Sequence, residues 1–210
     1  MLREYWEETW QKLQAPTVSQ DVLEKLIRAY SSPHRFYHNL THIEDCFTIF
    51  EQAKSLATHP EEIELAIWFH DAVYDPRGSA NEQKSAEWAQ FVINQSGLGN
   101  AIVERVSRLI LATRHNAKLK DRDAQILIDV DLSILGREED TFWRYEENIR
   151  KEYAWVPESL FRQKRVEILR SFLNRQHIYH LDEYRERFEA RARANLMQAI
   201  ARLENVTRAV

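Results

Sequence analysis

The sequence has few of the residues that cross-link a chain or turn it sharply. Its 210 residues include one cysteine, four glycines and five prolines. The single cysteine, Cys46, excludes an internal disulfide framework and a zinc site built on several cysteines. Barrels and sandwiches need many tight turns, which glycine and proline favour. Their scarcity therefore predicts a fold made of long helices.

The sequence also has no large excess of either positive or negative charge. The 29 Lys and Arg residues stand against 33 Asp and Glu residues, a net charge of −4. Proteins that bind duplex nucleic acid take much of their affinity from basic surfaces, so such a partner is not expected. No apolar run reaches the ~18 residues of a membrane span, and the acidic first residues are unlike a secretion signal. The expected location is the cytoplasm, without a membrane partner; the oligomeric state is not predicted.

What the sequence does have is hydrophobic spacing of helical period along nearly its whole length. The predicted helices cover residues 2–14, 20–31, about 39–57, 61–74, 79–96, 101–114, 121–135, 138–154, 157–175 and 182–206. The last three are amphipathic and rich in Arg and Glu, a pattern typical of a solvated face with i,i+4 pairs. The prediction is one all-α domain over residues 1–210.

Two segments in the first half carry residues suited to chemistry. His38 and His42 are four positions apart, so they share one face if their helix begins early enough. The pair His70-Asp71 follows the apolar segment 65–69. Burying ionisable side chains at the end of so apolar a helix is unfavourable unless something neutralises them, and a metal ion does so.

Two further segments lie in the second half. Asp129 and Asp131 interrupt the apolar run 128–135. They are two positions apart on a helix and face different ways, so only one is expected to be a direct ligand. Residues 111–115 end in Arg114-His115. Taken singly each signal is weak, because a lone histidine on an apolar helix is more often a core residue.

The order of these residues along the chain is more specific than any one of them. His42, then His70-Asp71, then Asp131 give the pattern His, His-Asp, Asp, with no glycine-rich phosphate loop elsewhere. Two imidazoles and two carboxylates suit Mn²⁺, Fe²⁺, Zn²⁺, Co²⁺ or Mg²⁺ better than Ca²⁺ or Cu(I). Four protein ligands on an octahedral ion leave two positions for water or substrate.

These motifs resemble the HD superfamily of metal-dependent phosphohydrolases, and within it a bacterial branch known only as predicted phosphohydrolases. The matching segments are YHNLTHI (37–43), WFHDAVYD (68–75), NEQKSA (81–86), LATRH (111–115), DVDLSILG (129–136) and IRKEY (149–153). The first also resembles a segment of cyclic-nucleotide phosphodiesterases, whose late metal-binding Asp-Leu-Ser resembles residues 131–133. The resemblance covers roughly residues 35–200. It implies an HD-like helical bundle with additional N- and C-terminal helices, a metal-binding core at about 35–136 and C-terminal helices at about 138–206.

The resemblance also assigns roles. It makes His42, His70, Asp71 and Asp131 the metal ligands, with Asp71 able to bridge a second ion. His38 becomes the proton donor to the leaving oxygen. Dinuclear members of the superfamily carry two further histidines between the His-Asp pair and the last aspartate, where this chain has only His115. One tightly bound metal ion with an optional second is therefore expected.

Metal chemistry supplies the expected mechanism. A bound divalent cation lowers the pKa of its water and polarises a phosphoryl oxygen. Water then attacks phosphorus while His38 or a carboxylic acid protonates the departing oxygen. Asp75, expected one turn beyond Asp71, and Glu82 are candidates to orient the water. Asp75 is also typical of a turn residue, and Glu82 is also typical of a carboxylate in the first turn of a helix, where the helix dipole favours it.

Arg77, Arg114 and His115 are candidates to bind the substrate phosphate, as is Lys84, although each alone is also typical of a surface charge. The expected function is hydrolysis of a small phosphomonoester or phosphodiester, with a nucleotide favoured only by analogy. Two alternatives stay open: a non-catalytic metal-binding scaffold, and an iron-dependent oxygenase on the same scaffold. The oxygenase would need further histidine ligands.

Overall fold

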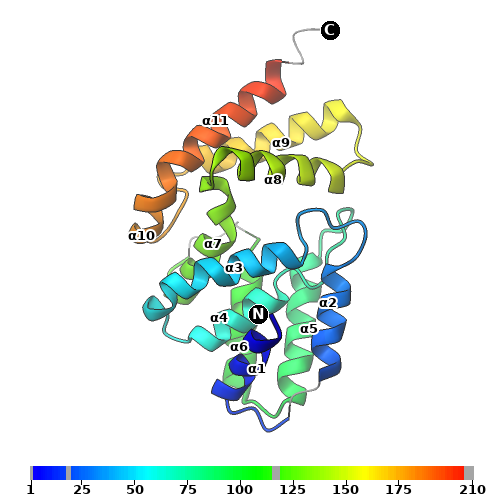
Figure 1. The fold of residues 1–210 in the computed structure, drawn as a ribbon, viewed down its shortest axis with the longest axis vertical. Helices are drawn as coiled ribbons and strands as arrows, with labels where there is room; N and C mark the ends of the chain where they lie inside the picture. Colours follow the sequence, from blue (N-terminus) through cyan, green and yellow to red (C-terminus); the bar gives the residue numbers. More distant parts are fainter. Residues whose placement is uncertain (1, 18–19, 115–118, 206–210) are drawn as a thin grey trace. The chain divides into compact units, whose positions relative to one another are not determined.

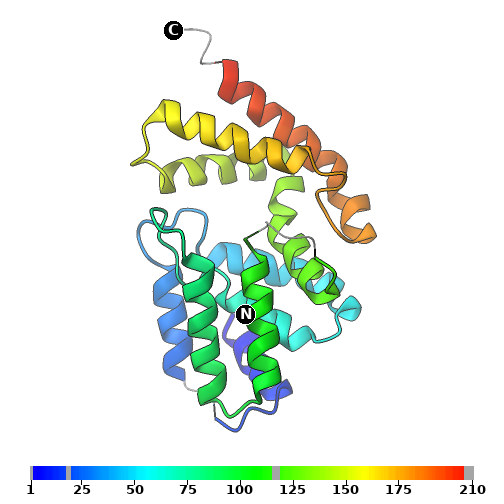
Figure 2. The same cartoon turned by 180° about the vertical axis from the view of Figure 1, so that it is seen from behind.

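The structure, a computed structural model, describes residues 2–17, 20–114 and 119–205. Over these ranges every regular element is a helix or a helical turn (Figures 1 and 2). The all-α prediction is therefore confirmed. Within the same ranges, no helix is both long and apolar enough to cross a membrane.

The chain forms two compact units, residues 1–130 and 131–210. Most elements of the first unit are helices of 10 to 15 residues. They are α1 (Leu2–Lys12), α2 (Gln20–Tyr30), α3 (Leu40–Ala53) with the 3₁₀ turn η1 (Lys54–Leu56), α4 (Pro60–Phe69), α5 (Asn81–Gln95), α6 (Asn100–Ala112) and α7 (Arg122–Asp131). Only the last residue of α7 is assigned to the second unit. The single domain expected from the sequence remains a prediction, because this division into compact units does not test it.

The second unit continues from α7 and is also helical. It contains the 3₁₀ turn η2 (Leu132–Gly136), α8 (Glu139–Glu152), α9 (Glu158–Leu173), α10 (Asp182–Tyr184), the π-helical turn η3 (Arg185–Glu189) and α11 (Ala190–Asn205). α11 packs against α9 and η2. The predicted helices 121–135 and 182–206 are thus each interrupted, the first by the tighter turn η2 and the second by the wider turn η3.

Helix α4 is the centre of the first unit. It packs against α1, α3, α5 and α6 (Figure 1), and every residue from Glu62 to Phe69 is buried. A helix that is apolar on all sides is expected in such a central position. Its two buried carboxylates have partners: Glu62 accepts two hydrogen bonds from Arg105, and Glu64 accepts one from Thr9 at 2.6 Å.

Helix α4 ends at Phe69, whereas the sequence predicted residue 74. After His70 the backbone forms a tighter turn, in which the N–H of Ala72 donates to the carbonyl oxygen of Phe69 at 3.0 Å. The carbonyl oxygen of Ala72 accepts a hydrogen bond from Arg35 Nη2 at 2.9 Å. The backbone therefore leaves the helix just where the His-Asp pair begins.

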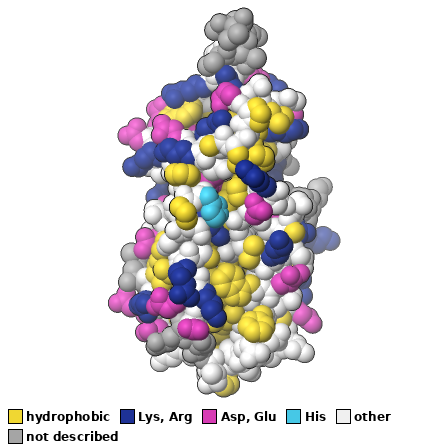
Figure 3. All heavy atoms as spheres, turned by 90° about the vertical axis from the view of Figure 1, so that its right-hand side faces the viewer, with side chains coloured by type: hydrophobic (Ala, Val, Ile, Leu, Met, Phe, Trp, Pro, Cys, Tyr) yellow, Lys and Arg dark blue, Asp and Glu magenta, His cyan; other side chains and the backbone are white. Residues whose placement is uncertain are grey.

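On the face drawn in Figure 3, Lys and Arg side chains lie among Asp and Glu side chains, and apolar groups reach the surface between them. Exposed large apolar side chains are few among the described residues; they are Phe36, Phe91, Trp155, Leu160, Ile168 and Met197. Most of the large hydrophobic side chains among the described residues are buried, as expected for helices that each bury one stripe.

Candidate metal centre

The first histidine of the site is placed by the start of α3. Asn39 is the N-cap of this helix: its backbone is extended, and its Oδ1 accepts hydrogen bonds from the backbone N–H groups of Thr41 (2.9 Å) and His42 (3.4 Å). An N-cap side chain of this kind satisfies donors that the first turn leaves unpaired. His42 consequently lies in the first turn, with its side chain buried.

His38 lies before the helix, so the expectation that it shares a helical face with His42 is wrong. The N-cap at Asn39 excludes residue 38 from α3. The His38 ring nevertheless lies 6.2 Å from that of His42, centroid to centroid. It stacks on Tyr74 at 4.3 Å and meets the edge of Tyr37 at 4.9 Å. Two aromatic neighbours thus hold the half-buried ring beside the site.

The second histidine caps the end of α4, and its hydrogen bonds select a tautomer. The backbone N–H of His70 donates to Ala66, and its Nδ1 lies 2.9 Å from the carbonyl oxygen of Ile67. A carbonyl oxygen only accepts, so we assign the proton to Nδ1. The other ring nitrogen, Nε2, then presents its lone pair. A backbone acceptor behind the ring is the usual arrangement for a metal-binding histidine.

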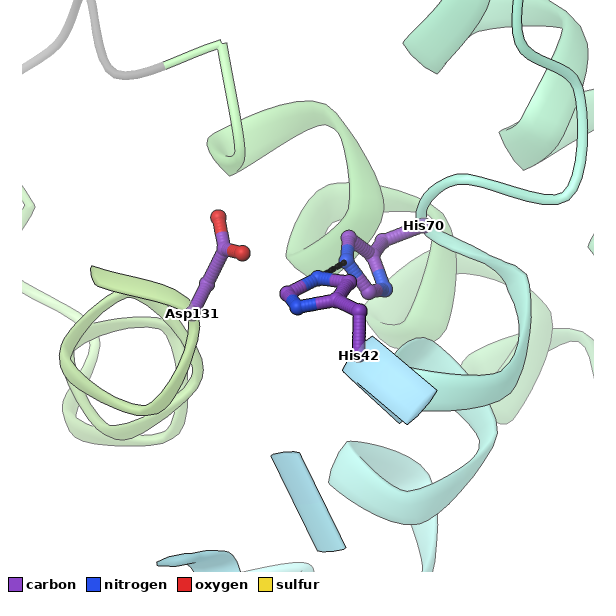
Figure 4. A group of neighbouring side chains, drawn as sticks. All are labelled: His42, His70 and Asp131. Atoms are coloured by element: carbon purple, nitrogen blue, oxygen red, sulfur yellow. Dashed lines mark hydrogen bonds between the residues drawn. The ribbon is translucent and has the colours of Figure 1, made fainter. Parts of the chain in front are cut away.

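Three side chains meet in a group that can hold a metal ion. They are His42, His70 and Asp131, whose ligand atoms all lie within 4.8 Å of one another. Figure 4 shows the two imidazole rings side by side, with Asp131 at the end of α7. The two Nε2 atoms are 3.2 Å apart, and both histidines are buried. Donor atoms bound at ~2.1 Å to one ion lie roughly 3–4 Å from each other, so the two Nε2 atoms have this spacing, whereas the 4.8 Å limit of the whole group is wider.

Asp71 adjoins the two histidines. Its Oδ2 lies 3.2 Å from His70 Nε2 and 3.8 Å from His42 Nε2. Burial by itself would raise the pKa of this carboxyl, but His70, His38 and His42 outweigh burial and hold the pKa well below its usual range. The carboxylate therefore carries its negative charge at neutral pH. With the two imidazoles it forms the mixed nitrogen and oxygen set that divalent transition ions favour.

Two other residues near the ligands have different surroundings. Asp129 is fully buried in α7 and lies outside the three-residue group, which contains Asp131. Cys46, one turn after His42, is also buried, and its Sγ lies 3.7 Å and 3.8 Å from the two ring nitrogens of His42. The thiol therefore lies against the imidazole of a candidate ligand.

Asp75 has a structural role in the loop after α4. Its Oδ1 accepts a hydrogen bond from the backbone N–H of Arg77, and its own backbone bonds to the side-chain amide of Asn81. The helix ends before Asp71, so the expected one-turn relation between Asp71 and Asp75 is wrong. Asp75 and Arg77 are both exposed.

Glu82 and Arg114, predicted as a catalytic carboxylate and a phosphate-binding cation, lie close to each other. Arg114 Nε is 3.6 Å from Glu82 Oε2, and both side chains are about one third exposed. Such a pair is typical of a surface contact that contributes little to stability. Lys84 is exposed on α5. His115 lies outside the described residues.

Arg35 is the residue that the sequence reasoning missed. It is 7% exposed, and its guanidinium donates to the carbonyl oxygens of His38 (3.0 Å), Asp71 (2.6 Å) and Ala72 (2.9 Å). Its Cζ lies 4.9 Å from the centroid of the Tyr30 ring. One buried cation therefore ties the loop of His38 to the His-Asp segment. A chain with 29 Lys and Arg residues gives no local signal that marks this one.

Tyr30 completes the same end of α4. Its hydroxyl donates to the carbonyl oxygen of Trp68 at 2.9 Å. The last carbonyls of a helix have no partner within it and need other donors. Tyr30 supplies such a donor to Trp68, and the ring of His70 supplies one to Ile67. Arg35 donates to the next carbonyls beyond the helix, those of Asp71 and Ala72. The segment that carries His70 is thus held by contacts distant in sequence.

No protein-family model, no curated protein and no solved structure matches the chain. The case for a metal ion at His42, His70 and Asp131 therefore rests on their geometry.

Proposed function

We propose that this protein is a divalent-metal-dependent phosphohydrolase of the HD type, acting on a small phosphomonoester or phosphodiester. The observation that supports the proposal most directly is the 3.2 Å approach of two buried Nε2 atoms within one group with Asp131. Burying two imidazoles edge to face beside carboxylates is unfavourable unless a cation balances them. The motif resemblance supports the same reaction class.

Different residues of the proposed site have different roles. When bound, a divalent ion lowers the pKa of water and polarises a phosphoryl oxygen. His42, His70 and Asp131 would hold it, and the ionised Asp71 adds negative charge beside them. An imidazole with its proton on Nδ1 binds through Nε2, which is the nitrogen that His70 presents. The identity of the ion and the presence of a second stay predictions.

His38 is the residue we assign to proton transfer. Hydrolysis adds the oxygen of water to phosphorus and breaks the bond to the leaving oxygen, which departs more easily if it gains a proton. The His38 ring lies next to the His42 ring but outside the three-residue ligand group. Stacking on Tyr74 limits its rotation. An imidazolium in this position would donate its proton to the leaving oxygen.

The test combines metal content with turnover. The purified protein is stripped with a chelator, reloaded separately with Mn²⁺, Fe²⁺, Zn²⁺, Co²⁺ or Mg²⁺, and assayed against phosphomonoesters and phosphodiesters. We expect at least one ion to bind in a molar ratio near one and to support hydrolysis. The His42→Ala variant should lose both properties. His177→Ala is the matched control, because His177 is exposed and far along the sequence in the second unit.

The possible results distinguish the proposed hydrolase from the two alternative functions. Metal binding without turnover on any phosphate ester would favour the non-catalytic scaffold. Iron binding with consumption of dioxygen would favour the oxygenase. Failure to retain any divalent ion, with the protein folded, would overturn the metal centre and the proposed function together.

A further inference from the structure

A cavity that is separate from the metal centre lies at the opposite ends of the two helices that carry His70 and Asp131. Its volume is about 550 Å³, within the ordinary range for sites that bind small molecules. Its lining residues come from around the starts of α4 and α7 and from α6, all within the first unit. At 1.5 Å per residue, the ten residues of α4 separate it from His70 by roughly 15 Å.

The carboxylates in the cavity wall already have hydrogen-bond donors. Glu62 accepts from Arg105 at 2.6 and 2.7 Å. Asp123 accepts from the backbone N–H groups of Thr58 (2.7 Å) and His59 (2.9 Å), and its Oδ2 lies 3.1 Å from His59 Nδ1. Asp121 accepts from the backbone N–H of Ala124 at 3.1 Å. Glu62 and Asp123 thus have several partners within the protein, whereas the exposed Asp121 has one backbone donor.

Two guanidinium groups of the same wall are not paired with carboxylates. Arg108 is exposed on α6 and makes no side-chain hydrogen bond or ion pair with the described residues. Arg122 makes one long hydrogen bond, 3.4 Å from its Nε to the carbonyl oxygen of Leu56. A guanidinium presents planar donors that match a carboxylate, phosphate or sulfonate. Leu109, Leu111 and Leu119 add an apolar lining beside these cations.

We propose that this cavity binds a small amphipathic organic anion. The anionic group pairs with Arg108 and Arg122, and the apolar body covers the leucines. Pairing in a partly enclosed site with apolar walls is stronger than on an open surface, because water screens it less. The site is separate from the metal centre and does not depend on the proposed hydrolase activity.

The experiment uses naphthalene-1-sulfonate, an aromatic anion that no phosphohydrolase cleaves, with uncharged 1-naphthalenemethanol as the matched probe. Binding to the full-length, metal-stripped protein is measured by titration calorimetry and by amide chemical shifts. We expect the sulfonate to bind more tightly than the alcohol, with shifts at residues 108–112 and 122–124. Arg108→Gln and Arg122→Gln should each weaken sulfonate binding about tenfold and leave the alcohol unaffected.

Three further variants keep the test decisive. Ala112→Phe fills the cavity without changing its charge and should abolish binding of both probes. Arg28→Gln, at an exposed arginine of α2, should bind the sulfonate like the parent protein. His42→Ala should also bind it normally, which separates this site from the metal centre. Equal affinity of the sulfonate for the parent and both arginine variants, or no binding at millimolar concentration, would overturn the proposal.

Discussion

Arg35 Nη1 lies 2.6 Å from the backbone carbonyl oxygen of Asp71, 36 positions along the chain. The same guanidinium donates to His38 and Ala72. This contact joins the segment that carries the proposed proton donor to the segment that carries the proposed ligand His70 and the adjoining Asp71. Its strength comes from a charged donor in a buried place, where water cannot replace it.

Arg35→Lys should weaken the metal centre without removing a ligand. One ammonium cannot reach all three carbonyls in the fork geometry of a guanidinium. We expect metal affinity to fall by ~10–100-fold, the usual effect of a residue behind the ligands. The free energy of unfolding should fall by about 2 kcal/mol, since buried carbonyls lose their donors. Competition with a chelator and urea unfolding measure the two effects.

Arg28→Lys is the control for this change, because Arg28 is exposed on the neighbouring helix α2. It should alter neither quantity. Undiminished metal affinity in folded Arg35→Lys would show that the arginine stabilises the loop alone and does not position the ligands.

His38→Ala and His42→Ala should fail in different ways. Without His38, metal content should stay near that of the parent, while turnover falls by ~10²–10⁴-fold, the typical contribution of a positioned proton donor. The loss should shrink for nitrophenyl esters, whose leaving group needs little protonation. Without His42, metal and activity should disappear together for every substrate.

Metal analysis and rates over a series of leaving groups distinguish these two patterns. The rings lie 6.2 Å apart, so the comparison changes the role while the location stays nearly constant. If both variants kept the same metal content and the same dependence on the leaving group, the assignment of His38 as acid would be wrong.

Asp131→Asn and Asp129→Asn test which aspartate of α7 binds the ion. Asp131 belongs to the ligand group, whereas Asp129 is fully buried and outside it. Asp131→Asn should abolish metal retention after gel filtration. Asp129→Asn should lower the affinity by ~10–100-fold at most, as for an indirect contact. The opposite order, measured by elemental analysis on folded protein, would move the site by two residues.

Gly136→Ala should destabilise the second unit. A methyl group there would lie 2.6 Å from Phe188 Cβ and 2.7 Å from the Phe188 carbonyl oxygen, and backbone cannot easily yield. Overpacking of this kind lowers the free energy of unfolding by about 1–3 kcal/mol. Gly99→Ala is the matched control, because no atom lies within 4 Å of its added methyl group.

Thermal and urea unfolding of the two glycine variants give the comparison. Gly99→Ala should stay within about 0.5 kcal/mol of the parent, as most surface substitutions do. An equal, small effect at both positions would contradict the close contact between η2 and Phe188.

The sequence by itself determined the fold class and the positions of most helices. Spacing of apolar residues at helical period reflects contacts within one helix and along one face, which local patterns record. It also marked His42, His70 and the aspartates Asp129 and Asp131 as candidates, because their types and order along the chain form a pattern that resembles a known metal-binding family. Such a pattern can be recognised without knowing which residues contact each other in the folded protein.

Only the tertiary structure decided how these residues meet. The end of α4 and the segment after it are held by Tyr30 and Arg35, whose hydrogen bonds to the carbonyl oxygens of residues 68, 71 and 72 join positions more than 35 residues apart. The same is true of the grouping of Asp131, and not Asp129, with the two histidines. A hydrogen-bond donor on a distant loop produces no periodic pattern in the sequence. Its position depends on how the whole chain folds and not on its neighbours in sequence.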